Sequence, residues 1–214
     1  MISRAYIDIS AVIISCDERR ALCEETIGAL RSSDWGDRSI DVIKNPVLGP
    51  PPEEAMLSNS RLALEKGAIN GTEFVLFLED DLLFNRYLIH NLSTWEPVVQ
   101  GKITVASLYD PGVFSVYRDP KGRFFVAHPL QIYGSQAFLI TSSTIHFVLM
   151  HWDEVQGLQD IRISRLAARL QLPIYYHIPS LVQHIGRRST WGGRSHRAHN
   201  FDPSWPFTEG GGYE

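Results

Sequence analysis

The sequence contains few of the residues that would place it in several large protein classes. Cys16 and Cys23 are its only cysteines, which excludes a disulfide framework and a zinc site built from four thiolates. No apolar run approaches the roughly 20 residues that a membrane-spanning helix needs. The N-terminus also lacks a basic segment followed by a long apolar core. We therefore expect a cytoplasmic protein that is not integral to a membrane.

Positive charge is scarce as well. The formal net charge is -4 and the sequence pI is about 6.1, which argues against a protein that binds nucleic acid by general electrostatics. Hydrophobic residues make up 44% of the chain and charged residues 21%, as is typical of globular proteins. At 214 residues the chain is long enough for one well-buried domain and too short for two ordinary ones.

Apolar runs with strand and helix spacing alternate along the chain. Ile7–Ser15 is rich in Ile and Val and predicts a first strand, and Asp17 is a suitable N-cap for a helix that ends near Arg31. Further strands and helices are predicted at Ser39–Ile43, Glu53–Gly67, Phe74–Leu78, Asn85–Trp95, Ile103–Leu108, Gln136–Thr141, Ser142–His151, Ile161–Leu170 and Ile174–Ile178.

This alternation favours an α/β fold with a mostly parallel central sheet flanked by helices. Val113–Tyr117 and Arg123–Ala127 add a small antiparallel hairpin, because Asp119-Pro120-Lys121-Gly122 has good turn chemistry. No change in composition divides residues 1–190, which we expect to form one domain. Residues 191–214 lack periodicity and are expected to form a flexible C-terminal tail.

Three consecutive carboxylates, Glu79, Asp80 and Asp81, follow the predicted strand Phe74–Leu78. Adjacent anions repel one another unless a cation or bonded donors compensate them, and carboxylate oxygens suit Mg²⁺ or Mn²⁺. The alternative is a solvated turn before the next helix. Open α/β sheets bind their ligands beyond the carboxyl ends of the strands, which favours a metal site.

Four short segments occur in an order that has a parallel in a known family. They are Ser15-Cys16-Asp17-Glu18-Arg19, Ser58-Asn59-Ser60-Arg61-Leu62-Ala63-Leu64, Phe77-Leu78-Glu79-Asp80-Asp81 and Pro179-Ser180-Leu181-Val182-Gln183-His184-Ile185-Gly186. The first three resemble segments of glycosyltransferases with the Rossmann-like GT-A fold, especially small enzymes of family GT2, with the acidic segment in place of the DxD motif. The fourth is similar to the end of the catalytic domain in GnT-IV-type N-acetylglucosaminyltransferases. The resemblance spans most of residues 8–190.

The resemblance implies a metal-dependent, inverting glycosyltransferase that moves a sugar from a nucleoside-diphosphate sugar, with UDP favoured, to an acceptor hydroxyl. Asp81 is the first candidate ligand for Mn²⁺ or Mg²⁺, and Glu79 would assist directly or through water. A glutamate at the first acidic position departs from the commonest DxD pattern. His184 would be an additional ligand, the alternative being a neutral histidine bonded to a backbone carbonyl. Asp80 is expected to reach a ribose or sugar hydroxyl.

The resemblance also suggests a catalytic base. Inverting GT-A enzymes carry a carboxylate near the start of a late helix, and Asp160 lies in the corresponding stretch. It would take the proton from the acceptor hydroxyl on the face opposite the leaving diphosphate. Asp153 and Glu154 are rival candidates, and the structural alternative for Asp160 is capping of the helix.

Other residues are expected to contact the donor. Asp17 could accept hydrogen bonds from uracil or ribose, and Arg61 could bond phosphate or base oxygens. Arg187 and Arg188 belong to a basic tail that could close over a diphosphate. The respective alternatives are a helix cap, a surface ion pair and a solvated terminus. Tyr133-Gly134-Ser135-Gln136 would face the sugar or the acceptor by resemblance.

Two other functions compete with this interpretation. A sugar nucleotidyltransferase needs a glycine-rich loop after the first strand to hold a triphosphate, whereas Cys16-Asp17-Glu18-Arg19-Arg20 contains no glycine. A non-catalytic module that binds nucleotide or carbohydrate remains the alternative from a different class. The sequence does not determine whether the acceptor is a glycan, a lipid-linked molecule or a small molecule.

Overall fold

The computed structural model describes residues 7–44, 52–132, 134–186, 197–206 and 208. Its main sheet is built from the strands β1 (Ile9–Ser15), β2 (Ile40–Lys44), β3 (Phe74–Leu78), β5 (Val105–Ser107), β6 (Ser115–Arg118), β7 (Phe124–Ala127), β8 (Ala137–Thr141) and β9 (Ile174–His177). These eight strands lie in the order β2-β1-β3-β8-β5-β9-β7-β6. Two more strands, β4 (Leu82–Phe84) and β10 (Val182–His184), pair with each other in a separate antiparallel sheet.

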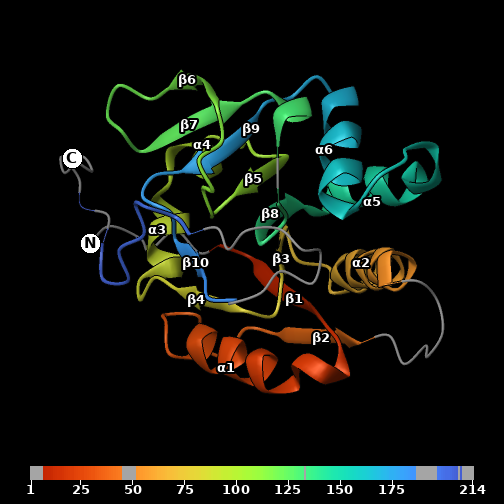
Figure 1. The fold of residues 1–214 in the computed structure, drawn as a ribbon. Coiled ribbons are helices and arrows are strands. Elements are labelled where there is room, and N and C mark those ends of the chain that lie inside the picture. The colour runs from red at the N-terminus through yellow and green to blue at the C-terminus, as the bar shows by residue number, and fades with distance from the viewer. Residues whose placement is uncertain (1–6, 45–51, 133, 187–196, 207, 209–214) are drawn as a thin grey trace.

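Helices cover both faces of the main sheet (Figure 1). The α-helices are α1 (Arg20–Arg31), α2 (Pro52–Ile69), α3 (Leu88–Thr94), α4 (Glu96–Val99), α5 (Ser142–Met150) and α6 (Gln159–Arg169). Short 3-10 turns occur at η1 (Asp17–Arg19), η2 (Pro129–Gln131) and η3 (Trp152–Glu154). Helices α1 and α3 pack on one face of the sheet, and α2, α5 and α6 pack on the other.

Alternating side chains along the strands divide the core between these two faces. In β3, Phe74, Leu76 and Leu78 pack with α1 and α3, whereas Val75 and Phe77 pack with α2, α5 and α6. All residues of β3 are buried. The strand is therefore buried on both faces, as its uninterrupted apolar run predicts.

The strand directions confirm the predicted fold class. The pairings give six strands of the main sheet one direction and reverse only β7 and β8, so the sheet is mostly parallel. Strands β6 and β7 form the predicted antiparallel hairpin. The sequence pattern did not predict β4 and β10, and the helix predicted from Asn85 begins at Leu88 instead.

The β4–β10 sheet joins two distant parts of the chain. Leu82 pairs with His184, and the backbone N–H of Ile185 donates to the carbonyl oxygen of Asp81 at 2.9 Å. The end of β10 therefore lies against the turn that follows β3. This arrangement positions the candidate site described below.

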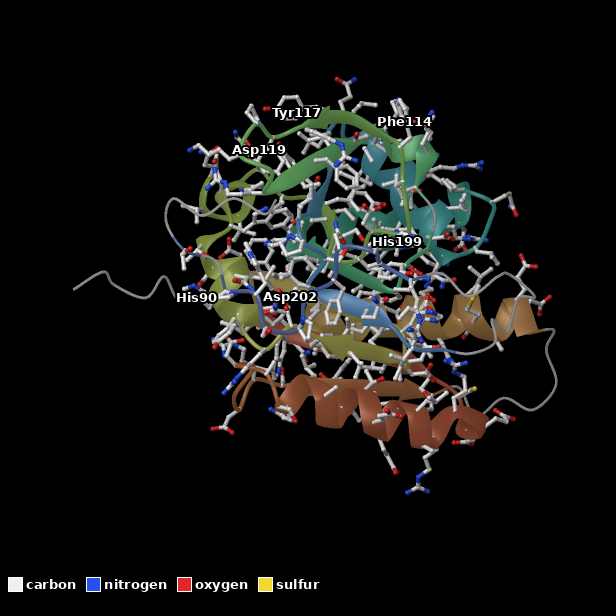
Figure 2. The ribbon with its side chains drawn as sticks, turned by 60° about the vertical axis from the view of Figure 1, so that its left-hand side comes forward. His90, Phe114, Tyr117, Asp119, His199 and Asp202 are labelled. Carbon is white, nitrogen blue, oxygen red and sulfur yellow. The ribbon has the colours of Figure 1, made fainter. Side chains whose placement is uncertain are left out.

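Within residues 197–206, the chain returns to β10 and the segment after β4. Ala198 exchanges two hydrogen bonds with the side chain of Gln183, both at 3.0 Å. Arg86 N donates to Pro203 O at 2.7 Å. Figure 2 shows His199 and Asp202 of this segment near β10. The division of the chain at residue 190 stays a prediction.

Among the helices in the described part of the chain, none combines the length and the apolar composition that crossing a membrane requires.

Close packing of α2 on β3 gives a test of the fold. A Cβ at Gly67 would lie 2.8 Å from Val75 Cγ1. We expect Gly67→Ala to lower the free energy of unfolding by about 1–3 kcal/mol, the usual cost of overpacking. Gly28→Ala in α1 is the matched control, because nothing lies within 4 Å of its Cβ. It should instead raise stability by roughly 0.5–1 kcal/mol through helix propensity. Urea denaturation measures both changes, and equal effects would contradict this packing.

Candidate metal centre

The three predicted metal ligands lie together at the carboxyl edge of the sheet. Glu79 and Asp81 follow β3, and His184 is the last residue of β10. One ligand atom from each residue lies within 4.8 Å of the other two. Asp81 Oδ2 and His184 Nε2 are 3.1 Å apart. Two carboxylates and an imidazole form a donor set that Mn²⁺ accepts, and we refer to these three residues as the metal cluster.

The turn between β3 and β4 is held from two sides. On one side, the Thr26 hydroxyl of α1 donates to Asp80 O at 2.8 Å and accepts from Leu82 N at 2.9 Å. On the other, Ile185 N donates to Asp81 O. These bonds fix the backbone of the acidic residues, so their side chains do not need a ligand to be positioned.

Arg19 is the counter-ion of the two aspartates. Its Nε donates to Asp80 Oδ1 at 2.7 Å, and its Nη2 donates to Asp81 Oδ2. Ser15 Oγ donates to Asp80 Oδ2 at 2.6 Å. Burial raises the pKa of Asp80 despite these bonds. Burial also acts to raise the pKa of Asp81, but His184 and Arg19 outweigh it and leave the pKa below its usual value.

One oxygen of the metal cluster has no protein partner. Asp81 Oδ1 is buried and accepts no hydrogen bond from any described residue. An unpaired buried acceptor costs roughly 1–3 kcal/mol, and more when the group is charged. A cation on this oxygen would remove that cost. Glu79 is half-buried, and burial together with the Asp81 carboxylate raises its pKa to about 7. The residues therefore fit a divalent cation, because uncompensated negative charge gathers where its ligands converge.

The loop before β8 links Glu79 to the start of α6. Ser135 Oγ donates to Glu79 Oε1 at 3.3 Å, and Gln159 Nε2 donates to Ser135 Oγ at 2.9 Å. Gly134 N donates to Asp160 Oδ2 at 2.9 Å. Asp160 is therefore separated from the metal cluster by one short loop. It does not cap α6, because it is the second residue of that helix.

Other expected site residues that the structure describes have partners or positions apart from the metal cluster. Asp17 begins η1, and no side chain caps α1, so the predicted helix cap is wrong. Arg61 forms ion pairs with Glu65 and Asp153 on the surface. Glu154 pairs with His151 and Arg169. Two further candidates, Arg187 and Arg188, lie outside the described residues.

Sequence reasoning assigned no role to Arg19 or Tyr109, although both lie near the metal cluster. Arg19 reaches the aspartates because β1 and β3 are neighbours in the sheet. Tyr109 follows β5, and its ring centroid lies 6.5 Å from that of His184. For Arg19 a signal was available, because it stands in the polar segment directly after the first strand. No local signal distinguishes Tyr109 from an ordinary core residue.

Arg19→Met tests the charge balance of this site. Removing one partner of a fully buried ion pair costs about 3–5 kcal/mol. Because 21% of the Arg19 side chain is exposed, we expect the free energy of unfolding to fall by a smaller amount, about 2 kcal/mol. Added Mn²⁺ should raise the thermal midpoint more in this variant than in the unmodified protein, since the guanidinium no longer repels the cation.

The adjacent exposed pair provides the control for this variant. Arg20 bonds Glu24 with both side chains largely in solvent, so Arg20→Met should change neither quantity appreciably. A response to Mn²⁺ that is the same in both variants and in the unmodified protein would contradict the assignment of Arg19 to the metal cluster.

Among the comparisons with known proteins, those with solved structures identify the fold. No family model matches the chain, and no curated protein matches its sequence. The structure of GalNAc-T7 with UDP, GalNAc and Mn²⁺ matches with a TM-score of 0.59 and 12% identity, over 88% of this chain and 45% of that chain. The present chain thus spans about half the length of that protein.

Two further solved structures are similar. A glycosyltransferase involved in glycosylation of the major capsid of PBCV-1 matches with a TM-score of 0.52 and 11% identity, over 85% of this chain and 94% of that chain. A mutant of Drosophila β1,4-galactosyltransferase 7 in complex with manganese, UDP-Gal and xylobiose matches with a TM-score of 0.53 and 12% identity, over 85% and 72%. At such identities these likenesses show the fold alone. The GT-A fold is thereby confirmed, whereas the similarity of residues 179–186 to GnT-IV-type enzymes stays a prediction.

Proposed function

We propose that this chain is a metal-dependent glycosyltransferase that uses a nucleoside-diphosphate sugar, with UDP as the favoured nucleotide. The metal cluster, with one buried carboxylate oxygen left unpaired, carries the proposal. It lies at the sheet edge where open α/β folds bind their ligands. Two of the similar proteins were solved with Mn²⁺ or manganese together with UDP or UDP-Gal, which supports the choice of metal and nucleotide.

The charge of the site supports a divalent cation. When Glu79, Asp80 and Asp81 are ionised, Arg19 neutralises only one of three negative charges, and two remain. A bare diphosphate would be repelled by this excess. Mn²⁺ or Mg²⁺ held by Glu79, Asp81 and His184 would offset both the excess and the charge that develops on a departing diphosphate.

Asp160 is the proposed catalytic base. It is half-exposed, and its bond from Gly134 holds it beside the loop that contacts Glu79. The acceptor oxygen attacks the anomeric carbon while the bond to the diphosphate breaks. The proton of the acceptor hydroxyl passes to Asp160, and the bonding electron pair leaves with the diphosphate. Attack from the opposite face inverts the anomeric centre.

The nucleotide contacts are part of the same proposal. Both oxygens of Asp80 already accept hydrogen bonds, from Ser15 and Arg19. Contact with a ribose hydroxyl would therefore add to this network or exchange one of its bonds. Arg61 would have to leave its ion pair with Asp153 to meet a phosphate. Because Asp80 needs no such rearrangement, it is the better supported nucleotide contact of the two.

The function is tested by measuring sugar transfer and donor hydrolysis across a panel of UDP-, dTDP- and GDP-sugars, with and without Mn²⁺. Asp81→Asn and His184→Ala should each weaken Mn²⁺ binding by about tenfold or more, because the first removes the negative charge of a ligand and the second removes the imidazole. Isothermal titration calorimetry with Mn²⁺ measures this loss independently of turnover. His146→Ala is the control, since His146 bonds only Ser142 O on the exposed face of α5.

Unchanged Mn²⁺ affinity in both ligand variants would remove the metal cluster from the proposal. Tight binding of UDP and Mn²⁺ without transfer or hydrolysis of any donor would instead support the non-catalytic binding module.

Asp160→Asn should lower the rate of transfer by about 100-fold or more, the usual contribution of a general base. The amide oxygen can still accept from Gly134 N, and only the bond from the neighbouring Ile161 N is lost, so the binding of UDP and Mn²⁺ should not change. Asp153→Asn is the matched variant, because 81% of that side chain is exposed and it pairs with Arg61. Steady-state kinetics compares the two, and ¹H NMR of the product reads its anomeric configuration. Normal turnover in Asp160→Asn with loss in Asp153→Asn would move the base to Asp153.

A further inference from the structure

A buried hydroxyl group without a partner lies beside the metal cluster. Tyr109 is 2% exposed, and its hydroxyl oxygen has no hydrogen-bond partner among the residues that the structure describes. Buried hydroxyl groups are normally paired, and leaving one unpaired lowers stability. If this residue served only to fill the core, phenylalanine would do so without the cost of an unpaired hydroxyl. The hydroxyl can therefore accept a partner that the described residues do not supply.

The backbone around Tyr109 places it next to Glu79. Leu108 N donates to Ala137 O at 3.0 Å, at the start of β8. The preceding residue, Gln136, accepts a hydrogen bond from Glu79 N at 3.0 Å. Tyr109 and Glu79 thus flank the same end of β8, one on each side.

The backbone also ties this segment to β10. Leu108 O accepts from Leu181 N at 2.8 Å and from Val182 N at 3.2 Å. Val182 begins the strand that ends in His184, and the Tyr109 ring meets the His184 ring in an edge-on arrangement. Tyr109 therefore lies between the two chain segments that supply the metal cluster.

The surroundings of the hydroxyl are negative. The carboxylates of Glu79, Asp110 and Asp81 all lie near the phenol. A tyrosine hydroxyl is protonated at neutral pH and can serve as a hydrogen-bond donor. Asp81 Oδ1, another buried oxygen near Glu79 without a partner among the described residues, is an acceptor that suits a cation. A cation with a bound oxygen atom would satisfy both atoms: the cation would meet Asp81 Oδ1, and the oxygen would accept from the Tyr109 hydroxyl.

We infer that the Tyr109 hydroxyl donates a hydrogen bond to an oxygen atom of the ligand held at the metal cluster. This inference rests on the proposed function and adds a positioning residue to it. The oxygen atom could come from a water on the cation or from a phosphate of the nucleotide. Both present the same acceptor, and separate titrations distinguish them.

Tyr109→Phe keeps the ring against His184 and removes only the hydroxyl. The thermal midpoint without ligand should be unchanged or higher, because an unpaired buried group is lost. Affinity should fall by about tenfold, the usual effect of one hydrogen bond to a charged group. A fall for Mn²⁺ alone assigns the bond to a metal-bound water. A fall only for UDP in the presence of Mn²⁺ assigns it to a phosphate oxygen.

Tyr175→Phe is the matched control. Tyr175 is also a core tyrosine, at 9% exposure, but its ring packs on Trp95 and Phe124. Tyr175→Phe should leave the affinity for Mn²⁺ and the affinity for UDP with Mn²⁺ unchanged.

Wild-type affinities for both ligands in Tyr109→Phe would overturn the inference while leaving the proposed function intact, whatever the effect on stability. If the unmodified protein binds neither Mn²⁺ nor UDP, the proposed function and the inference fail together.

Discussion

Burial of adjacent carboxylates at the end of β3 is the constraint on which the rest of the site depends. The strand is apolar and buried on both faces, so its continuation enters an environment where charge is costly. The chain offsets part of this cost through Ser15 of β1, which bonds the Asp80 carboxylate, and Arg19 of η1, which bonds both aspartates. The compensation is incomplete, because one buried carboxylate oxygen keeps no partner in the described structure. A protein that needed only a stable turn would gain by replacing these groups with apolar ones, so the remaining charge points to a ligand.

Close approach of backbone to the acidic residues is the second requirement. A Cβ at Gly186 would lie 2.3 Å from Asp81 Oδ2 and 2.7 Å from His184 Nε2. Only glycine leaves room for both side chains at once. The small β4–β10 sheet then holds His184 opposite Leu82, more than a hundred residues away in sequence. Backbone pairing thus brings a histidine to the two carboxylates, where its Nε2 lies 3.1 Å from Asp81 Oδ2.

Local patterns determine how much of this could be predicted. The strand at Phe74–Leu78 could be predicted, because an apolar run stops there at three carboxylates. The structure has this strand, and Glu79 and Asp81 lie together at its end. The strand β10 is only three residues long and pairs with a distant segment, so periodicity could not reveal it. Asp17 is not the expected cap because a 3-10 turn precedes α1. Tyr109 could not be predicted, because only the three-dimensional structure reveals that its hydroxyl is buried without a partner among the described residues.

The reversal of β8 explains why the candidate base and the metal cluster share one edge of the sheet. In a purely parallel sheet, the loops before the strands lie at the opposite edge from the loops after them. Because β8 runs antiparallel to β3, the loop before β8 meets the end of β3, and Ser135 contacts Glu79 there. The same loop bonds Asp160 through Gly134 and thereby draws the start of α6 to that edge. One strand reversal thus brings the proposed base and the proposed metal ligands to the two ends of one short loop. The solved glycosyltransferases share this fold at 11–12% identity, so the fold itself does not require similarity of overall sequence.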